Sequence, residues 1–170
     1  MQGYAKNTVS DLVKVQSGTV TAQAAFTISS LTAGAKYRLM VNLTQNTAAG
    51  IPTLTFNGDT GANYASAWGY HVQGGANGVA AVTQTSIAFM GGYSLTAGTY
   101  WYGEYTFQPL SGNNNYMTVF GHSGSFLSVN SAPCSNSMAG QYSGSASISS
   151  MTITLSAGTV TGNWTLYQLS

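Results

Sequence analysis

The chain has 170 residues, which suits a single domain with a substantial buried core. Only 4% of its residues are charged, against about 25% in an average globular protein, and its formal net charge is +1. So few charges, and a net charge close to zero, provide no basic surface for nucleic acid or for an anionic membrane, so neither is expected as a partner.

The N-terminal residues differ in character from the rest. Residues 1–18 hold a large share of the few charges and show weak patterning, which predicts an N-terminal arm followed by one domain over residues 19–170. Within the arm, only the run "NTVSDLVKVQ" has a spacing that favours a turn or two of helix. No apolar stretch has the length of a signal-peptide core or of a membrane span.

From residue 19 onward the sequence predicts strands, because apolar and polar residues alternate and glycine-containing turns separate the runs. In "KYRLMVNLT" the residues Tyr37, Leu39, Val41 and Leu43 share one face, as expected for antiparallel strands on one core. About ten strands are expected, near residues 19–29, 36–44, 53–57, 63–72, 84–90, 99–107, 116–122, 125–130, 147–156 and 162–168. So many short strands predict an all-β fold, a two-sheet antiparallel β-sandwich of jelly-roll type.

The loop "FNGDTGANY" at residues 56–64 combines glycines with Asp59, one of three acidic residues. A calcium loop needs several carboxylates, and a phosphate loop needs a lysine and a following helix; neither set is present. Asn57-Gly58 is well suited to a type I′ turn, which predicts a structural turn between strands. A weak calcium site using Asp59 and Asn63 is the alternative.

The strand expected at 99–107 carries aromatic residues on both faces. Tyr100, Tyr102 and Glu104 alternate with Trp101 and Tyr105, so another subunit is expected to cover its outer face.

Few residues suggest a metal site or a nucleophile. His71 and His122 lack metal-ligand partners at nearby positions, and a symmetric site between subunits is the only arrangement that would use them. Cys134 is the single cysteine and is expected to be a small side chain in a loop. No metal and no cofactor are predicted.

Catalysis is not expected either. Glycoside hydrolysis requires two carboxylates, and Asp59 and Glu104 are the only plausible pair. The run "GHSGS" at residues 121–125 resembles a nucleophile elbow only superficially, because no helix follows it. It is predicted to be a hairpin turn, and the protein is predicted not to be an enzyme.

Aromatic side chains near glycine, asparagine and glutamine are the remaining candidates for function. Such rings bind sugars by stacking on them, and they also pack in protein cores and in subunit interfaces. The candidate residues for glycan or subunit contact are Trp68, Tyr70, Tyr93, Trp101 and Tyr102.

Several runs resemble a domain of tailed-bacteriophage virion proteins. The "YRL" strand, the "LTFNGDTGANY" loop, the "ISSMTIT" strand and the closing "GNWTLY" strand carry the resemblance, which spans about residues 28–170. It implies a homo-oligomeric β-sandwich with a structural or binding role, found in tail fibres, decoration proteins and other virion parts. In its usual last strand a charged residue precedes Leu-Tyr, whereas Trp164-Thr165 stands here.

The expected function is therefore a virion structural protein, a capsid decoration (cement) protein or small head-fibre subunit that acts by burying protein surface. The alternative is a tail-fibre or receptor-binding module that attaches to bacterial surface polysaccharide. The expected partners are further copies in a homotrimer or dimer, the major capsid protein and, in the alternative, a host glycan. The expected location is the virion, assembled in the host cytoplasm.

Overall fold

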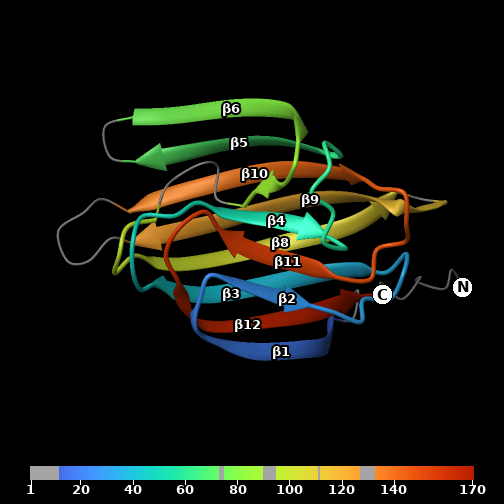
Figure 1. Ribbon diagram of the computed structural model, residues 1–170, viewed down its shortest axis with the longest axis horizontal. Coiled ribbons are helices and arrows are strands. Elements are labelled where there is room, and N and C mark those ends of the chain that lie inside the picture. The colour runs from blue at the N-terminus through green and yellow to red at the C-terminus, as the bar shows by residue number, and fades with distance from the viewer. Residues whose placement is uncertain (1–11, 73–74, 90–94, 111, 127–132) are drawn as a thin grey trace, which may run out of the picture.

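The computed structural model describes residues 12–72, 75–89, 95–110, 112–126 and 133–170, which form strands and connecting loops without any helix (Figure 1). None of these residues therefore forms a helix of the length and hydrophobicity that crossing a membrane requires. The strands are β1 (Leu12–Gln23), β2 (Ala25–Ile28), β3 (Lys36–Gln45), β4 (Pro52–Phe56), β5 (Tyr64–Val72), β6 (Gly75–Gln84), β7 (Ile87–Ala88), β8 (Tyr100–Leu110), β9 (Asn113–Phe126), β10 (Cys134–Ser143), β11 (Met151–Leu155) and β12 (Val160–Leu169).

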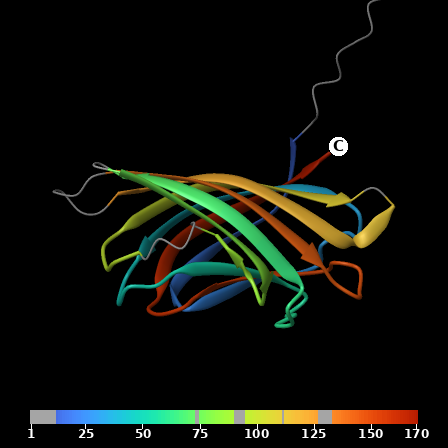
Figure 2. The same cartoon turned by 90° about the horizontal axis from the view of Figure 1, so that it is seen from above.

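The strands form two antiparallel sheets that pack face to face (Figure 2). The larger sheet has eight strands in the order β1-β12-β3-β8-β9-β10-β5-β6, and the smaller has four in the order β2-β11-β4-β7. The prediction of an all-β, two-sheet antiparallel sandwich is confirmed.

The strand order is that of a jelly roll with two inserted hairpins. Setting aside β5–β6 and β9–β10 leaves eight strands, which along the chain can be numbered one to eight. They then lie in the order 1-8-3-6 in the larger sheet and 2-7-4-5 in the smaller one, which is the double Greek key of a jelly roll. The inserted strands extend the larger sheet beyond β8 (Figure 1).

The alternation read from the sequence matches the observed burial. In β3 the predicted face of Tyr37, Leu39, Val41 and Leu43 is buried, and β11 buries Met151, Ile153 and Leu155 in the same way. These residues join one continuous core between the sheets. Burial of apolar side chains from both inner faces is therefore what holds the two layers together.

The N-terminal boundary differs from the prediction. Residues 12–18, expected in an arm or a short helix, form the first half of β1 and pair with β12; residues 1–11 lie outside the described residues. The single strand expected at residues 19–29 is divided between two strands, the end of β1 and all of β2. Ala22, near the end of β1, has a φ of 50°, and between Gln23 and Ala25 the chain passes from the larger sheet to the smaller one.

The prediction of a hairpin turn at residues 121–125 is wrong. β9 runs without interruption from Asn113 to Phe126, and each of these five residues pairs with β8 and β10. The glycine at 121 serves packing rather than a turn, because the buried ring of Tyr105 occupies the space where a Cβ atom would lie.

Candidate functional site

The loop at residues 56–64 connects the two sheets as a tight turn. Phe56 ends β4 and Tyr64 begins β5, and between them Asn57 and Gly58 have φ values of 53° and 67°. The amide of Asp59 donates to the carbonyl of Phe56 at 2.9 Å, which closes the four-residue turn. Positive φ at both central residues is what a type I′ turn requires, so the prediction of a structural turn is confirmed.

The carboxylate of Asp59 is used within this loop. It accepts hydrogen bonds from the Gly61 amide at 2.7 Å, from Asn63 Nδ2 at 2.8 Å and from the Tyr142 hydroxyl at 3.1 Å. The Gly61 hydrogen bond and then that of Asn63 lower the pKa of Asp59 below its ordinary value. Asp59 and Asn63, the residues of the alternative calcium site, are thus hydrogen-bonded to each other.

The aromatic residues predicted as contact residues do not share one surface. Trp101 is fully buried and donates from Nε1 to the Tyr105 hydroxyl at 3.2 Å, so it belongs to the core. Trp68 packs against the core and stacks on Tyr70, with ring centroids 6.0 Å apart. Tyr102 is half exposed on the outer face of the larger sheet, and Tyr93 lies outside the described residues.

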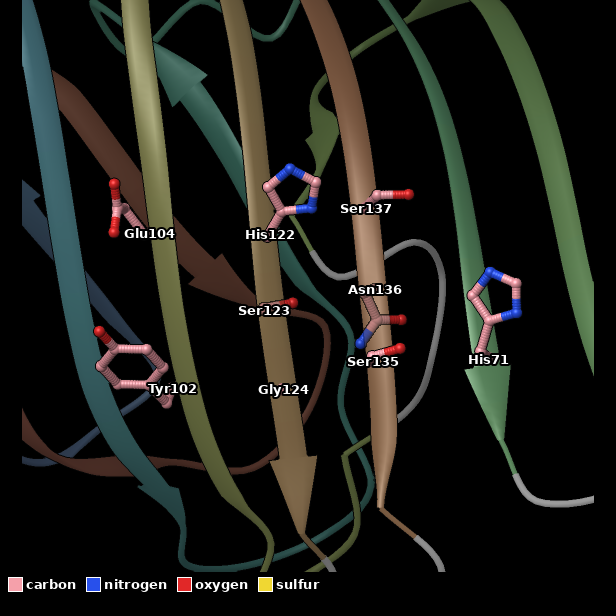
Figure 3. A pocket seen from close by; sticks show the side chains of 9 residues that line it. All are labelled: His71, Tyr102, Glu104, His122, Ser123, Gly124, Ser135, Asn136 and Ser137. Atoms are coloured by element: carbon pink, nitrogen blue, oxygen red, sulfur yellow. The ribbon is translucent and has the colours of Figure 1, made fainter.

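A groove of about 490 Å³ lies beside Tyr102 on that outer face (Figure 3). Antiparallel pairing aligns its residues in two rows across the strands. The first row is Glu104 on β8, His122 on β9 and Ser137 on β10. The second row is Tyr102 on β8, Gly124 on β9, Ser135 on β10 and His71 on β5.

The groove follows from side-chain size. Gly124, Ser135 and Ser137 are small, whereas Tyr102 and Glu104 on one side and His71 on the other are long. Because neighbouring strands are about 4.8 Å apart, the three intervals from β8 to β5 span about 14 Å. The low centre is closed below by the buried residues Ser123 and Asn136.

An ion pair fixes one wall of the groove. Arg38 Nε on β3 lies 3.2 Å from Glu104 Oε1, and both side chains are partly exposed. His122 is the cross-strand partner of Glu104, but in Figure 3 the Glu104 carboxylate lies on the side of β8 away from β9. Charge within the groove is thus already balanced by Arg38 at its edge.

Sequence reasoning treated the two histidines as isolated and missed this arrangement. His71 and His122 belong to strands that the fold places on either side of β10. Their proximity depends on strand order and register. The alternation of apolar and polar residues within a segment predicts neither of these. The sequence held a partial signal only at His122, which stands between glycine and serine residues.

The groove residues do not form a catalytic or metal-binding constellation of the types considered. Among the described residues, no three histidine, cysteine, aspartate or glutamate side chains are grouped as metal ligands. Glu104 contacts Arg38, whereas Asp59 belongs to the β4–β5 loop, so these two carboxylates do not form a pair. What the groove offers is a set of hydroxyl, imidazole and carboxylate groups beside one aromatic ring.

Cys134 lies near the groove but beneath its surface. It begins β10 and is buried, so it is not the loop residue that the sequence suggested. Burial raises the pKa of its thiol. The sulfur is therefore protonated at neutral pH and is a poor nucleophile.

Comparisons with known proteins do not assign the chain to a family. No family model matches it, and searches of curated proteins and of solved structures gave no significant match.

Proposed function

We propose that this chain is a structural subunit of a bacteriophage virion, a capsid decoration protein or small head fibre that acts by burying apolar surface against other protein. The support is its low charge, its jelly-roll sandwich and the resemblance of its "FNGDTGANY" loop and closing strands to a virion domain. Asp59, the centre of that loop, has a structural role, which agrees with a subunit that performs no chemistry.

The observation that carries this proposal is the β1 patch, a run of exposed apolar residues on both faces of an edge strand of the larger sheet. Leu12, Val13 and Val15 at the start of β1 are 46%, 57% and 40% exposed. Among the residues that the structure describes, β1 pairs only with β12, so its other side is an open edge in that part of the chain. Each 100 Å² of apolar surface covered there contributes about 2.5 kcal/mol before the costs of association.

This edge favours side-chain packing over the addition of a strand. A register shift lies between Lys14 and Gln16, and a bulge with a nearby lysine is a usual means of blocking strand addition. We therefore assign the patch to a contact with a second copy of the chain or with the capsid surface.

The decisive experiment is the copy number of the chain in purified particles of the virus that encodes it, measured by quantitative mass spectrometry. Decoration predicts hundreds of copies per particle, and a head fibre predicts tens. A handful of copies would indicate a tail tip, and complete absence from particles would overturn the virion proposal.

A second candidate function is attachment to bacterial surface polysaccharide. The specific observation in its favour is the groove beside Tyr102, which combines an accessible ring with several hydrogen-bonding groups. This face is separate from the β1 patch, so a subunit could use both. Binding of the purified protein to host cells, abolished by periodate oxidation of their glycans, is the expected result.

A further inference from the structure

We propose that the groove on the outer face of β8, β9, β10 and β5 is a binding site for an uncharged polysaccharide chain. This inference rests on the second candidate function and names its site and its ligand class. It does not depend on the β1 patch or on the location of the protein in a virion.

The shape of the site suits an extended ligand. Along β9, the outward-facing positions are Phe120, His122, Gly124 and Phe126, and alternate residues of a strand lie about 7 Å apart. Phe120 and Phe126 are more than half exposed and stand on either side of the low position at Gly124. A volume of about 490 Å³ lies within the usual range of roughly 300–1,000 Å³ for small-ligand sites.

One wall provides a stacking surface. Tyr102 is 50% exposed, and its cross-strand partner is Gly124, which leaves one side of the ring free of a neighbouring side chain on β9. The apolar face of a sugar ring can pack against such an aromatic side chain while the phenol hydroxyl remains in water. An exposed tyrosine beside a glycine is well suited to this contact.

The remaining walls provide hydrogen bonds of both kinds. Ser135 and Ser137 can each donate and accept, a neutral imidazole at His71 or His122 does both, and the Glu104 carboxylate accepts. Glu104 is held by Arg38 at 3.2 Å, so its orientation is constrained before a ligand arrives. Alternating donors and acceptors match the hydroxyl groups of a sugar, each of which also donates and accepts.

The charge of the groove selects against an anionic chain. Glu104 is the only formally charged side chain among the groove residues, and Arg38 already balances it. A sulfate or phosphate would face a carboxylate and find no unpaired lysine or arginine in the groove to compensate. The ligand class is therefore a neutral glycan rather than an acidic one.

The position of the groove in the fold also supports a binding role. Its residues lie on β8 and on strands of both inserted hairpins, which extend the larger sheet beyond the eight jelly-roll strands. The outward side chains rest on a hydrogen-bonded sheet, so the walls are held on rigid strands rather than on a loop.

The first experiment uses the two histidines as reporters. The chain has only two, and both line the groove, so their imidazole proton signals in an NMR spectrum can be assigned by the His71→Gln and His122→Gln variants. Neutral and acidic glycans on a microbial glycan array would first identify a bound oligosaccharide, which is then titrated. We expect a neutral oligosaccharide to shift both imidazole signals.

Variants then locate the site. Tyr102→Ala, which removes the stacking surface, and Ser137→Trp, which fills the groove, should each weaken binding at least tenfold. Tyr116→Ala, at an outward position of β9 six residues before His122, and Gln141→Trp on β10 outside the groove are the controls and should bind as the original protein does. Circular dichroism and thermal unfolding verify that all four variants are folded.

The outcomes separate the site from the function. If a glycan binds but neither imidazole signal moves and Tyr102→Ala has no effect, the groove proposal is overturned while glycan attachment stands. Binding of acidic glycans alone refutes the ligand class. If no glycan on the array binds and host cells are not bound either, both the site and the second candidate function fail.

Discussion

At the scale of single residues, the loop between β4 and β5 depends on a few polar side chains rather than on buried area. Asn57 Oδ1 accepts from the amides of Ser149 and Ser150 at 2.9 and 3.2 Å, and its Nδ2 donates to the Ser147 carbonyl at 3.0 Å. These bonds connect the loop to the segment that precedes β11. Asparagine also tolerates the positive φ found here, so one residue satisfies both the turn and the connection.

Asp59 should contribute to the dependence of the protein's stability on pH in acid. Its pKa is lowered from 3.8, chiefly by the Gly61 amide, so the charged form is favoured in the folded state. A lowered folded pKa contributes stability that is fully present above pH 3.8 and is lost as the pH falls through the folded pKa. We expect Asp59→Asn to reduce the free energy of unfolding at pH 7 and to weaken its dependence on pH below 3.8.

Urea unfolding between pH 2 and 7 measures this effect. The chain has only three acidic residues, so one carboxylate can account for a visible part of the acid transition. Thr60→Ala, an exposed position in the same loop, serves as the control and should keep the full dependence. Parallel pH profiles for Asp59→Asn and the original protein would contradict the assignment.

At the scale of strands, pairs of glycine and aromatic residues determine how β8 and β9 pack. Tyr105 is buried, stacks on Phe89 with ring centroids 3.8 Å apart, and donates to the Phe89 carbonyl at 3.1 Å. Its ring lies over Gly103 on its own strand and Gly121 on the neighbouring one. The two glycines thus create the space that a ring of this size requires between β8 and the smaller sheet.

Gly121→Ala should destabilise the fold although it is a small change within a strand. An added Cβ would overlap the buried Tyr105 ring, and overpacking of this kind costs about 1–3 kcal/mol. For a chain of this size that corresponds to a decrease in Tm of roughly 5 °C. Gly124→Ala on the same strand is the control, since its Cβ would meet only the Cys134 carbonyl oxygen at 3.9 Å. Equal Tm values for the two variants would refute the packing role of Gly121.

Alternation predicted the jelly-roll strands well and the inserted hairpins poorly. β3, β11 and β12 show clear apolar faces because both sheets contribute them to one core. β10, by contrast, places Asn136 and Cys134 on its buried side, and β9 contains three glycines or serines in a row, so both segments resembled turns. The candidate site was predictable only at Tyr102, because the register that aligns His71, His122 and Glu104 is a property of the whole sheet.

At the scale of the whole molecule, the fold separates two kinds of surface. The jelly-roll strands supply the core and the β1 edge, while the inserted strands supply most of the groove. The larger sheet holds both, with β1 at one end and β5 near the other. Copies that associate through β1 would thus leave the groove of each copy uncovered, so that several grooves could bind one polysaccharide.

Association through the β1 patch should be apolar in character and nearly independent of salt. The chain has only four basic and three acidic residues, so added salt has few charges to screen. Burial of Leu12, Val13 and Val15 does not depend on charge. Light scattering after size-exclusion chromatography should give the same oligomeric mass in 0.05 and 0.5 M sodium chloride.

Val13→Asp should shift the protein toward monomer, because a carboxylate would be desolvated in the contact. Thr60→Asp, an equal change of charge in the β4–β5 loop, should leave the mass unchanged. A monomer for the original protein at all concentrations, with no binding to capsids, would refute the role of this edge.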